Sequence, residues 1–410
     1  MKKYVIIGNG TAAVGCIEGI RTVDRDGEIT VISAENHSVY SRPLISYYLE
    51  GKTDLQRMKY RDDGFYKENG CKVLYGKTAK SINADKKAVV LDSEEKIKYD
   101  ELCVAAGSRP FVPLFEGLDT VTQKFSFMTL DDALSLEKAL TKESRVLIVG
   151  AGLIGLKCAE GIRDRAGKIT VCDLAGRVLS SILDDDCAAI VQKHLEDNGI
   201  EFLLADSATK IDKNVAYMKS GKTVTFDILV LAVGVRANSE IVKEAGGEVN
   251  RGIIINTKME TSLPHIYAAG DCAEGYDSLL GSNRVLAILP NAYMQGQTAG
   301  VNMAGGDRVF DNAMPVNSIG FFGLHMMTAG CYDGEMTKEK TDGGIKRFFE
   351  KEGYLRGFIL IGQTDRAGIY TSLIRNKTPL NEIDADFTKK VASSSIFSSE
   401  IRRKKFGGVV

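Results

Sequence analysis

The sequence predicts an α/β fold that consists of two similar βαβ domains and a smaller α+β domain toward the C-terminal end. Two segments, which begin at Lys3 and at Arg145, each run from a short apolar strand through a glycine-rich turn and a helix to a second strand. Their strands are continuous apolar runs, which is typical of a parallel sheet buried on both faces. After Pro315 the pattern changes to short β-runs with a turn near Gly353. The simplest interpretation is an internal duplication followed by a domain of another kind.

The first segment has the form of a dinucleotide-binding unit. A strand over residues 3–7 leads into the turn GNGTAA, and a second strand is expected over residues 28–33. Gly8 allows the tight turn, and Gly10 lets the backbone approach a pyrophosphate, which would lie on the N–H groups at the start of the helix. Ala13 lets that helix pack closely on the strand. Alone, such a turn is a weak signal, because ordinary glycine-rich turns look the same.

Two acidic residues strengthen this interpretation. Glu35 lies just beyond the second strand, where a carboxylate can accept hydrogen bonds from ribose hydroxyls. Asp271 closes a strand predicted over residues 261–271, in the pattern AAGD. A helix with small residues on one face is expected over residues 291–303.

Between the two segments, the sequence indicates β-structure and then a linker. Residues 72–90 have the pattern of a strand and a hairpin, and residues 102–105 form another buried strand that ends in AGSRP. Pro110 and Pro113 mark the linker that follows.

The second segment carries the full dinucleotide fingerprint. The turn GAGLIG contains Gly150, Gly152 and Gly155, and it stands between a strand over residues 145–149 and a helix. The next strand is expected over residues 168–172. The turn therefore lies in the strand–turn–helix–strand order that a dinucleotide site requires.

Asp173 stands at the end of that next strand, which is the expected place for the acid that binds a ribose. A carboxylate there would repel a 2′-phosphate, so the sequence favours NADH over NADPH. Arg177 is the opposing signal, since a nearby arginine can accept that phosphate. A last buried strand over residues 228–233 leads into GVRAN.

The composition excludes several classes of protein. The chain has 410 residues and a net charge of −1, from 53 basic and 54 acidic residues, so it has no electrostatic signal for nucleic acid or an anionic membrane surface. No apolar run approaches the ~18 residues of a membrane-spanning helix. The eight cysteines occur in no metal-ligand spacing, and most lie in apolar runs. We therefore expect a cytoplasmic protein without a metal site, structural disulfides, or nucleic-acid or membrane partners.

Taken in order, the motifs resemble those of the FAD-dependent pyridine nucleotide–disulfide oxidoreductases over about residues 1–375. The motifs are GNGTAA, LCVAAGSRP, GAGLIG, LAVGVRAN and TSLPHIYAAGDCAE. The resemblance implies two Rossmann-like domains, for FAD and NAD, with Asp271 at the FAD ribitol and Glu35 at the adenosine ribose. The cofactor-binding residues that it implies are Gly8, Gly10, Thr11, Ala12, Ala13, Glu35, Ala105, Ala106, Gly107, Arg109, Gly270 and Asp271 for FAD, and Gly150, Gly152, Leu153, Ile154, Gly155, Asp173 and Gly234 for NAD. Two positions depart from the family's pattern: Ala106 stands where Thr is commoner, and Ala237 where Pro is commoner.

Domain boundaries follow from the same comparison. The FAD-binding domain is expected to comprise residues 1–112 and 238–312, interrupted by an NAD-binding domain of residues 113–237. A small α+β domain would cover residues 313–380. The polar, Ser-rich stretch 381–410 would be a tail beyond the resemblance.

The missing redox cysteine narrows the choice of branch. Many family members carry a cysteine pair or a single cysteine at the flavin, but the corresponding stretch VYSRPLISYYLEG has none, and Pro43 stands where the single-cysteine branch has its sulfur. Without a thiolate there is no dithiol relay and no sulfenate chemistry. The pattern instead resembles the branch that passes electrons directly from flavin to a protein. That branch includes rubredoxin and ferredoxin reductases and the flavin portion of assimilatory nitrite reductase.

Other positions gain a role from the resemblance. Arg42 is expected to contact the flavin or pyrophosphate, the alternative being a surface loop arginine. Pro290 and Asn291 precede a helix whose N-terminus would offer N–H groups to flavin O2 and N1.

Two candidate catalytic residues replace a charge pair of the family. Many relatives have a Glu where this chain has Lys157, paired with a Lys where this chain has Tyr47. A single cation on the nicotinamide side would favour the anionic reduced flavin. The alternative is that Lys157 lies on the solvent face of its helix.

The predicted function is hydride transfer between NADH and FAD, with electrons passed to a small redox protein such as rubredoxin. One alternative is an FAD- and NAD-binding electron-transfer subunit of a larger metalloenzyme complex, to which the basic cluster IRRKK near the C-terminal end could dock an acidic partner. Another is a non-catalytic NADH-sensing flavoprotein.

Overall fold

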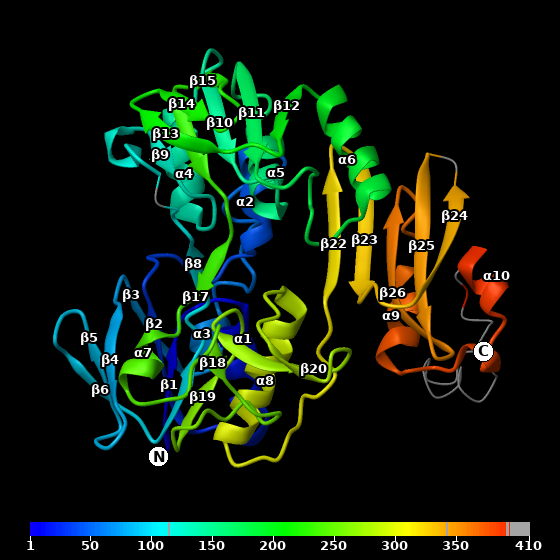
Figure 1. Cartoon of the computed structure of the whole chain (residues 1–410). Helices are drawn as coiled ribbons and strands as arrows, with labels where there is room; N and C mark the ends of the chain where they lie inside the picture. Colours follow the sequence, from blue (N-terminus) through cyan, green and yellow to red (C-terminus); the bar gives the residue numbers. More distant parts are fainter. Residues whose placement is uncertain (114, 342, 391–392, 394–410) are drawn as a thin grey trace. The chain divides into compact units, whose positions relative to one another are not determined.

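The computed structural model describes residues 1–113, 115–341, 343–390 and 393 (Figure 1). By their contacts the residues fall into two compact units. Of the described residues, the first unit comprises those within 1–177 and 199–313, and the second comprises 178–198 with those from residue 314 onward. Within the described residues, no helix has both the length and the apolar character needed to cross a membrane.

The first unit contains two five-stranded sheets, each with all of its strand pairs parallel (Figure 1). The predicted α/β class is therefore confirmed. We name the two sheets after the cofactors that the sequence predicts for them. The FAD-side sheet has the order β19 (Ile266–Ala268), β7 (Glu101–Val104), β1 (Lys3–Ile7), β2 (Glu28–Ser33) and β3 (Cys71–Tyr75). The NAD-side sheet has the order β9 (Lys124–Phe125), β16 (Ile228–Leu231), β10 (Arg145–Val149), β11 (Lys168–Asp173) and β12 (Ile200–Leu204).

The duplication extends to an inserted antiparallel sheet in each half. In both halves the insertion stands between the edge strand (β3 or β12) and the strand beside the centre (β7 or β16). The insertions are β4 (Ala79–Asn83), β5 (Ala88–Leu91) and β6 (Lys96–Lys98) in one half, and β13 (Ala208–Asp212), β14 (Val215–Met218) and β15 (Thr223–Thr225) in the other. Two short antiparallel strands connect the halves: β8 (Ser108–Pro110) and β17 (Val235–Ala237).

Helices pack on these sheets, and two of the helices begin at the predicted glycine-rich turns. The remaining elements of the first unit are α1 (Thr11–Val23), η1 (Arg42–Leu44), α2 (Ile45–Leu49), α3 (Phe65–Glu68), η2 (Leu118–Thr120), α4 (Leu130–Ala139), α5 (Leu153–Ile162), α7 (Glu240–Glu244), β18 (Ile253–Ile254), β20 (Ala273–Asp277), β21 (Ser282–Arg284) and α8 (Leu289–Met303). The strand expected over residues 261–271 is much shorter, because residues 261–265 form a turn in which the Thr261 hydroxyl donates to backbone carbonyls.

Glycines bring α1 and α8 into backbone contact. A Cβ atom on Gly15 or Gly19 of α1 would overlap the backbone of α8, and one on Gly296 or Gly300 of α8 would overlap the backbone of α1. This pairing explains the small residues on one face of the 291–303 segment. It fixes α1, which begins at the first dinucleotide turn, against a long buried helix.

The second unit is α+β, as the sequence predicts. Its sheet is antiparallel, in the order β22 (Val316–Phe321), β23 (Leu324–Gly330), β26 (Tyr354–Ile361), β25 (Gly344–Lys351) and β24 (Glu335–Thr341). The other elements are α6 (Asp185–Asp197), α9 (Ala367–Arg375), η3 (Leu380–Glu382) and α10 (Ala385–Lys390). The α6 segment belongs here because Arg347 of β25, only 4% exposed, pairs with Asp184 and Asp186. Most of the predicted tail lies outside the described residues.

Candidate functional site

The turn after β1 is built to admit a phosphate group. Gly8 has φ +107°, and a Cβ atom there would overlap the carbonyl oxygen of Ala105 at the end of β7. Beside Gly10, by contrast, a Cβ atom would meet no heavy atom within 4 Å. No side chain caps the N-terminus of α1. Open space next to uncapped helical N–H groups fits the pyrophosphate of a dinucleotide.

The turn after β10 repeats this geometry in the other sheet. Gly150 has φ +117°, and a Cβ there would overlap the carbonyl oxygen of Ala232, just beyond β16. A Cβ on Gly152 would meet nothing within 4 Å, and no side chain caps α5. A Cβ on Gly155 would overlap the Gly150 carbonyl oxygen, so only glycine permits this approach of helix and turn. Leu153 and Ile154 form the first turn of α5.

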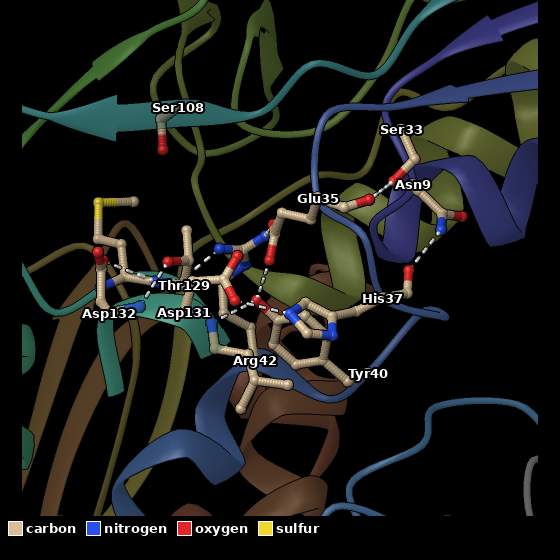
Figure 2. Close-up of polar contacts among 12 residues, drawn as sticks. Asn9, Ser33, Glu35, His37, Tyr40, Arg42, Ser108, Thr129, Asp131 and Asp132 are labelled. Atoms are coloured by element: carbon tan, nitrogen blue, oxygen red, sulfur yellow. Dashed lines mark hydrogen bonds and ion pairs between the residues drawn. The ribbon is translucent and has the colours of Figure 1, made fainter. Parts of the chain in front are cut away.

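Glu35 is held by two neighbours that close the loop after β2 (Figure 2). The Tyr40 hydroxyl donates to Glu35 Oε2 at 2.6 Å, and Arg42 Nη2 donates to Glu35 Oε1 at 2.7 Å. Burial, the largest cause, raises the pKa of Tyr40 well above its usual value. Arg42 thus lies beside the predicted adenosine site, and its partner is the carboxylate predicted to bind the ribose.

The same loop is tied to the start of α4. The Leu130 backbone N–H donates to the Tyr40 hydroxyl at 2.9 Å, and Arg42 Nη1 donates to the Met128 carbonyl oxygen at 2.6 Å. His37 Nε2 lies 2.8 Å from Asp131 Oδ1. No role was predicted for Tyr40, although it is the tyrosine of the YSRP stretch that indicates the branch.

Asp271 lies at the carboxyl edge of the FAD-side sheet, just after β19. Burial raises the pKa of Asp271, opposed by the Ser108 hydroxyl, 3.4 Å from Oδ2, and by the charge of Arg42. The preceding Gly270 has φ +81°, and its N–H donates to Gln295 Oε1 at 2.8 Å. A partly buried carboxylate with so few donors fits a ligand that brings hydroxyl groups.

Asp173 is held beside the second turn. Its Oδ2 accepts from the Ala151 N–H at 2.7 Å, and its Oδ1 accepts from the Ala175 N–H at 2.7 Å. Gly234, just beyond β16, has φ +110° and open space beside it. The predicted ribose acid and the fingerprint turn therefore lie at one edge of the NAD-side sheet.

The structure brings Lys157 and Tyr47 together. Lys157 Nζ lies 4.6 Å from the ring centroid of Tyr47, and its side chain is 18% exposed, so it does not occupy a solvent face of α5. The sequence predicts that Lys157 is a single cation without a charged partner. This is wrong, because Lys157 forms an ion pair with Glu160, one turn further along α5. Glu160 is not among the residues predicted from the sequence.

Other predicted residues have varied surroundings. Arg109 pairs with Glu240 at 2.6 Å and with Asn238 at 2.9 Å, and this arginine lowers the pKa of Glu240 to about 2. Pro43 is exposed within η1, and Asn291 is buried near the start of α8. Whether Arg109 and Pro43 contact a cofactor stays a prediction.

All eight cysteines are free thiols. Six are buried, whereas Cys71 and Cys331 are partly exposed. Cys272, next to Asp271, donates to the Val104 carbonyl oxygen at 3.2 Å, and burial raises its pKa to about 12. A thiol of this kind is a poor source of thiolate.

Comparison with known proteins decides the family. The family model described as pyridine nucleotide-disulphide oxidoreductase matches residues 2–296. The chain belongs to this family. It is an FAD-dependent NAD(P)H oxidoreductase. The two open glycine turns, with Asp271 and Asp173 at the same sheet edges, fit FAD and a nicotinamide dinucleotide.

Relatives of this oxidoreductase match most of its length. The NADH-dependent phenylglyoxylate dehydrogenase subunit epsilon of Aromatoleum evansii is 30% identical over 400 residues, 94% of each chain. The NADH-rubredoxin oxidoreductase of Clostridium acetobutylicum is 28% identical over 80% of this chain and 81% of its own. The nitrite reductase (NAD(P)H) of Bacillus subtilis is 30% identical over 93% of this chain and 48% of its own.

Solved structures share the fold of this oxidoreductase. The covalent putidaredoxin reductase–putidaredoxin complex matches with a TM-score of 0.87 at 22% identity over 98% of both chains.

Proposed function

We propose that this oxidoreductase takes a hydride from NADH onto FAD and passes the electrons to a small redox protein such as rubredoxin. The observation that carries the proposal is the pair of matched turns in one unit, each with open space at its second glycine. Bound FAD would supply the conversion of a two-electron hydride into single electrons. This chain's residues would bind the two dinucleotides, orient them and exclude water.

On the FAD side, the turn from Gly8 to Gly10 would hold the pyrophosphate. Glu35, oriented by Tyr40 and Arg42, would accept from the adenosine ribose, and Asp271 would accept from the ribitol hydroxyls. Each carboxylate retains acceptor capacity, because an ionised carboxylate can accept about four hydrogen bonds.

On the NAD side, the turn from Gly150 to Gly155 would hold the pyrophosphate and Asp173 the adenosine ribose. We propose NADH as the preferred donor, because the Asp173 carboxylate would repel the 2′-phosphate of NADPH. The names of the relatives from Aromatoleum evansii and Clostridium acetobutylicum, both of which specify NADH, support this choice.

Lys157 and Tyr47 would lie where the two dinucleotides meet. Tyr47 belongs to α2, which directly follows the loop that holds Glu35 and Arg42. Lys157 is two residues beyond Gly155, the last glycine of the NAD fingerprint. We assign them to the positioning of the nicotinamide over the flavin.

Anaerobic mixing of the FAD-loaded protein with NADH tests the first half-reaction. The flavin absorbance should bleach rapidly, and oxidised rubredoxin added next should restore it. Failure of NADH to bleach the flavin would refute the proposal as a whole. Bleaching without reoxidation by rubredoxin would leave the hydride step standing and remove rubredoxin as the acceptor.

A second candidate function is that of a flavin subunit in a larger metalloenzyme complex. It is favoured by the subunit epsilon relative, which matches this chain almost from end to end. Size-exclusion chromatography of native extract, followed by identification of co-eluting proteins, tests it. Elution at the mass of this chain alone would argue for the first candidate.

A further inference from the structure

A buried carboxylate, that of Glu160, lies beside the contact between Lys157 and Tyr47. Glu160 is only 4% exposed, and its Oε2 contacts Lys157 Nζ. Lys157 therefore lies between an aromatic ring on α2 and a carboxylate on its own helix. A second pair, Lys52 with Glu50 at 3.0 Å, lies nearby, with Lys52 Nζ 5.9 Å from the Tyr47 ring centroid.

Close helix packing fixes this arrangement. Gly161, next to Glu160, lies so near α2 that a Cβ atom would be 2.9 Å from the Ser46 carbonyl oxygen. Arg165 donates to the Leu49 carbonyl oxygen at the end of α2. There is thus little room between the helices, and a carboxylate buried there requires an opposite charge.

We propose that Glu160 is a positioning residue that sets how strongly the charge of Lys157 acts on bound flavin. The inference rests on the proposed function, which places the flavin and nicotinamide beside this cluster. A cation near the flavin ring stabilises the anionic reduced form. A carboxylate in contact with that cation cancels much of its field at longer range and holds the ammonium group at one position.

The pair of Lys157 and Glu160 carries no net charge, and both partners belong to one helix. The proposal predicts opposite effects on removal of each partner. Loss of Glu160 leaves a cation, and loss of Lys157 leaves a carboxylate. A residue with only a structural role would lower stability in both cases without opposite shifts in potential.

The test is the midpoint potential of the FAD-loaded protein, measured by spectroelectrochemical titration. Glu160→Gln should raise the potential by about 30 mV, which corresponds to a tenfold change in the two-electron equilibrium constant. Lys157→Met should lower it, and the double variant should return close to the parent value. Glu201→Gln is the control, because Glu201 is an exposed ion-pair partner of Lys168 on β12.

Several outcomes would overturn the proposal. They are an unchanged potential in both single variants, a shift of the same sign in both, or a double variant that keeps the full shift of Glu160→Gln. If Glu160→Gln does not fold with FAD, Lys157→Met and the double variant still give the comparison, since the second charge removal should reverse the first. Bleaching of the parent by NADH separately tests the proposed function.

Discussion

Among single residues, Asp271 has opposite effects on ligand binding and on the stability of the FAD-free protein. Its folded-state pKa is raised by burial, so the folded state binds a proton more readily than the unfolded chain. The favourable contribution is present below the unfolded pKa of about 3.9 and is lost as the pH rises through the raised folded value. At neutral pH the buried charge therefore destabilises the FAD-free protein.

Asp271→Asn should separate these two effects. At pH 7 the FAD-free variant should melt at a higher temperature than the FAD-free parent, and this advantage should shrink at about pH 4 and below. FAD binding should weaken by about 1–3 kcal/mol, because one charged acceptor oxygen is replaced by an NH2 group that cannot accept from a ligand hydroxyl. Calorimetry without FAD and titration with FAD measure the two quantities. Unweakened FAD binding would show that Asp271 is not the ribitol ligand.

Asp173 carries the prediction about the nucleotide. Asp173→Ser removes the negative charge beside the second turn, so the ratio of kcat/KM for NADH to that for NADPH should fall by tenfold or more, or about 1.4 kcal/mol. Glu201→Gln serves again as a control that removes one exposed charge from the neighbouring strand. A parent protein that prefers NADPH would contradict the assignment.

For single residues, the sequence predicts a role where that role depends on the local backbone conformation. Gly8 and Gly150 were predictable because only glycine accepts their φ values and close backbone neighbours. Tyr40 and Glu160 were not, because their roles arise from contacts with α4 and with the α2–α5 junction. Nothing in a tyrosine or a helical glutamate indicates such partners beforehand.

Among the elements, helices α1 and α8 can pack with their backbones in contact only because glycines lie between them. Gly296→Ala would normally strengthen a helix, but its Cβ would overlap the Ala12 carbonyl oxygen. We expect it to destabilise the first unit by about 1–3 kcal/mol and to weaken FAD binding by moving the start of α1. Gly368→Ala in α9 is the matched control, since its Cβ would meet nothing within 4 Å, and it should stabilise by up to about 1 kcal/mol. Thermal unfolding measures both; a stabilised Gly296→Ala would refute the packing argument.

The positions of strands along the chain could be predicted from apolar runs. The sheet against which a given helix packs could not. Strands β2 and β10 have the predicted bounds, because the mainly apolar residues of each strand end at a turn. The predicted strand at 228–233 ends at Leu231, before the backbone turns. The place of α6 in the second unit depends on Arg347 and its two aspartates, and a helical pattern alone does not say which sheet a helix will cover.

For the whole molecule, the buried thiols predict a turnover without cysteine chemistry. Burial raises the pKa of Cys172 and Cys187 to about 12 and that of Cys71 to about 11. Anaerobic dithionite titration should therefore consume two electrons per FAD, with no long-wavelength thiolate–flavin band. Alkylation of the exposed thiols should leave NADH-to-dye activity largely intact. Uptake of four electrons would mean that a cysteine reaches the flavin, and the direct-transfer mechanism would be wrong.

The antiparallel pair β8 and β17 gives the chain a modular construction. Pro110 and Val235 are register partners, so the chain leaves the FAD-side half and returns to it at adjacent points. In protein-engineering terms, the intervening residues are an insertion whose two ends lie side by side. A short turn from Pro110 to Val235 could close the remaining chain. Because the intervening segment includes residues 178–198, which belong to the second unit, an exchange for another nucleotide specificity would have to keep those residues.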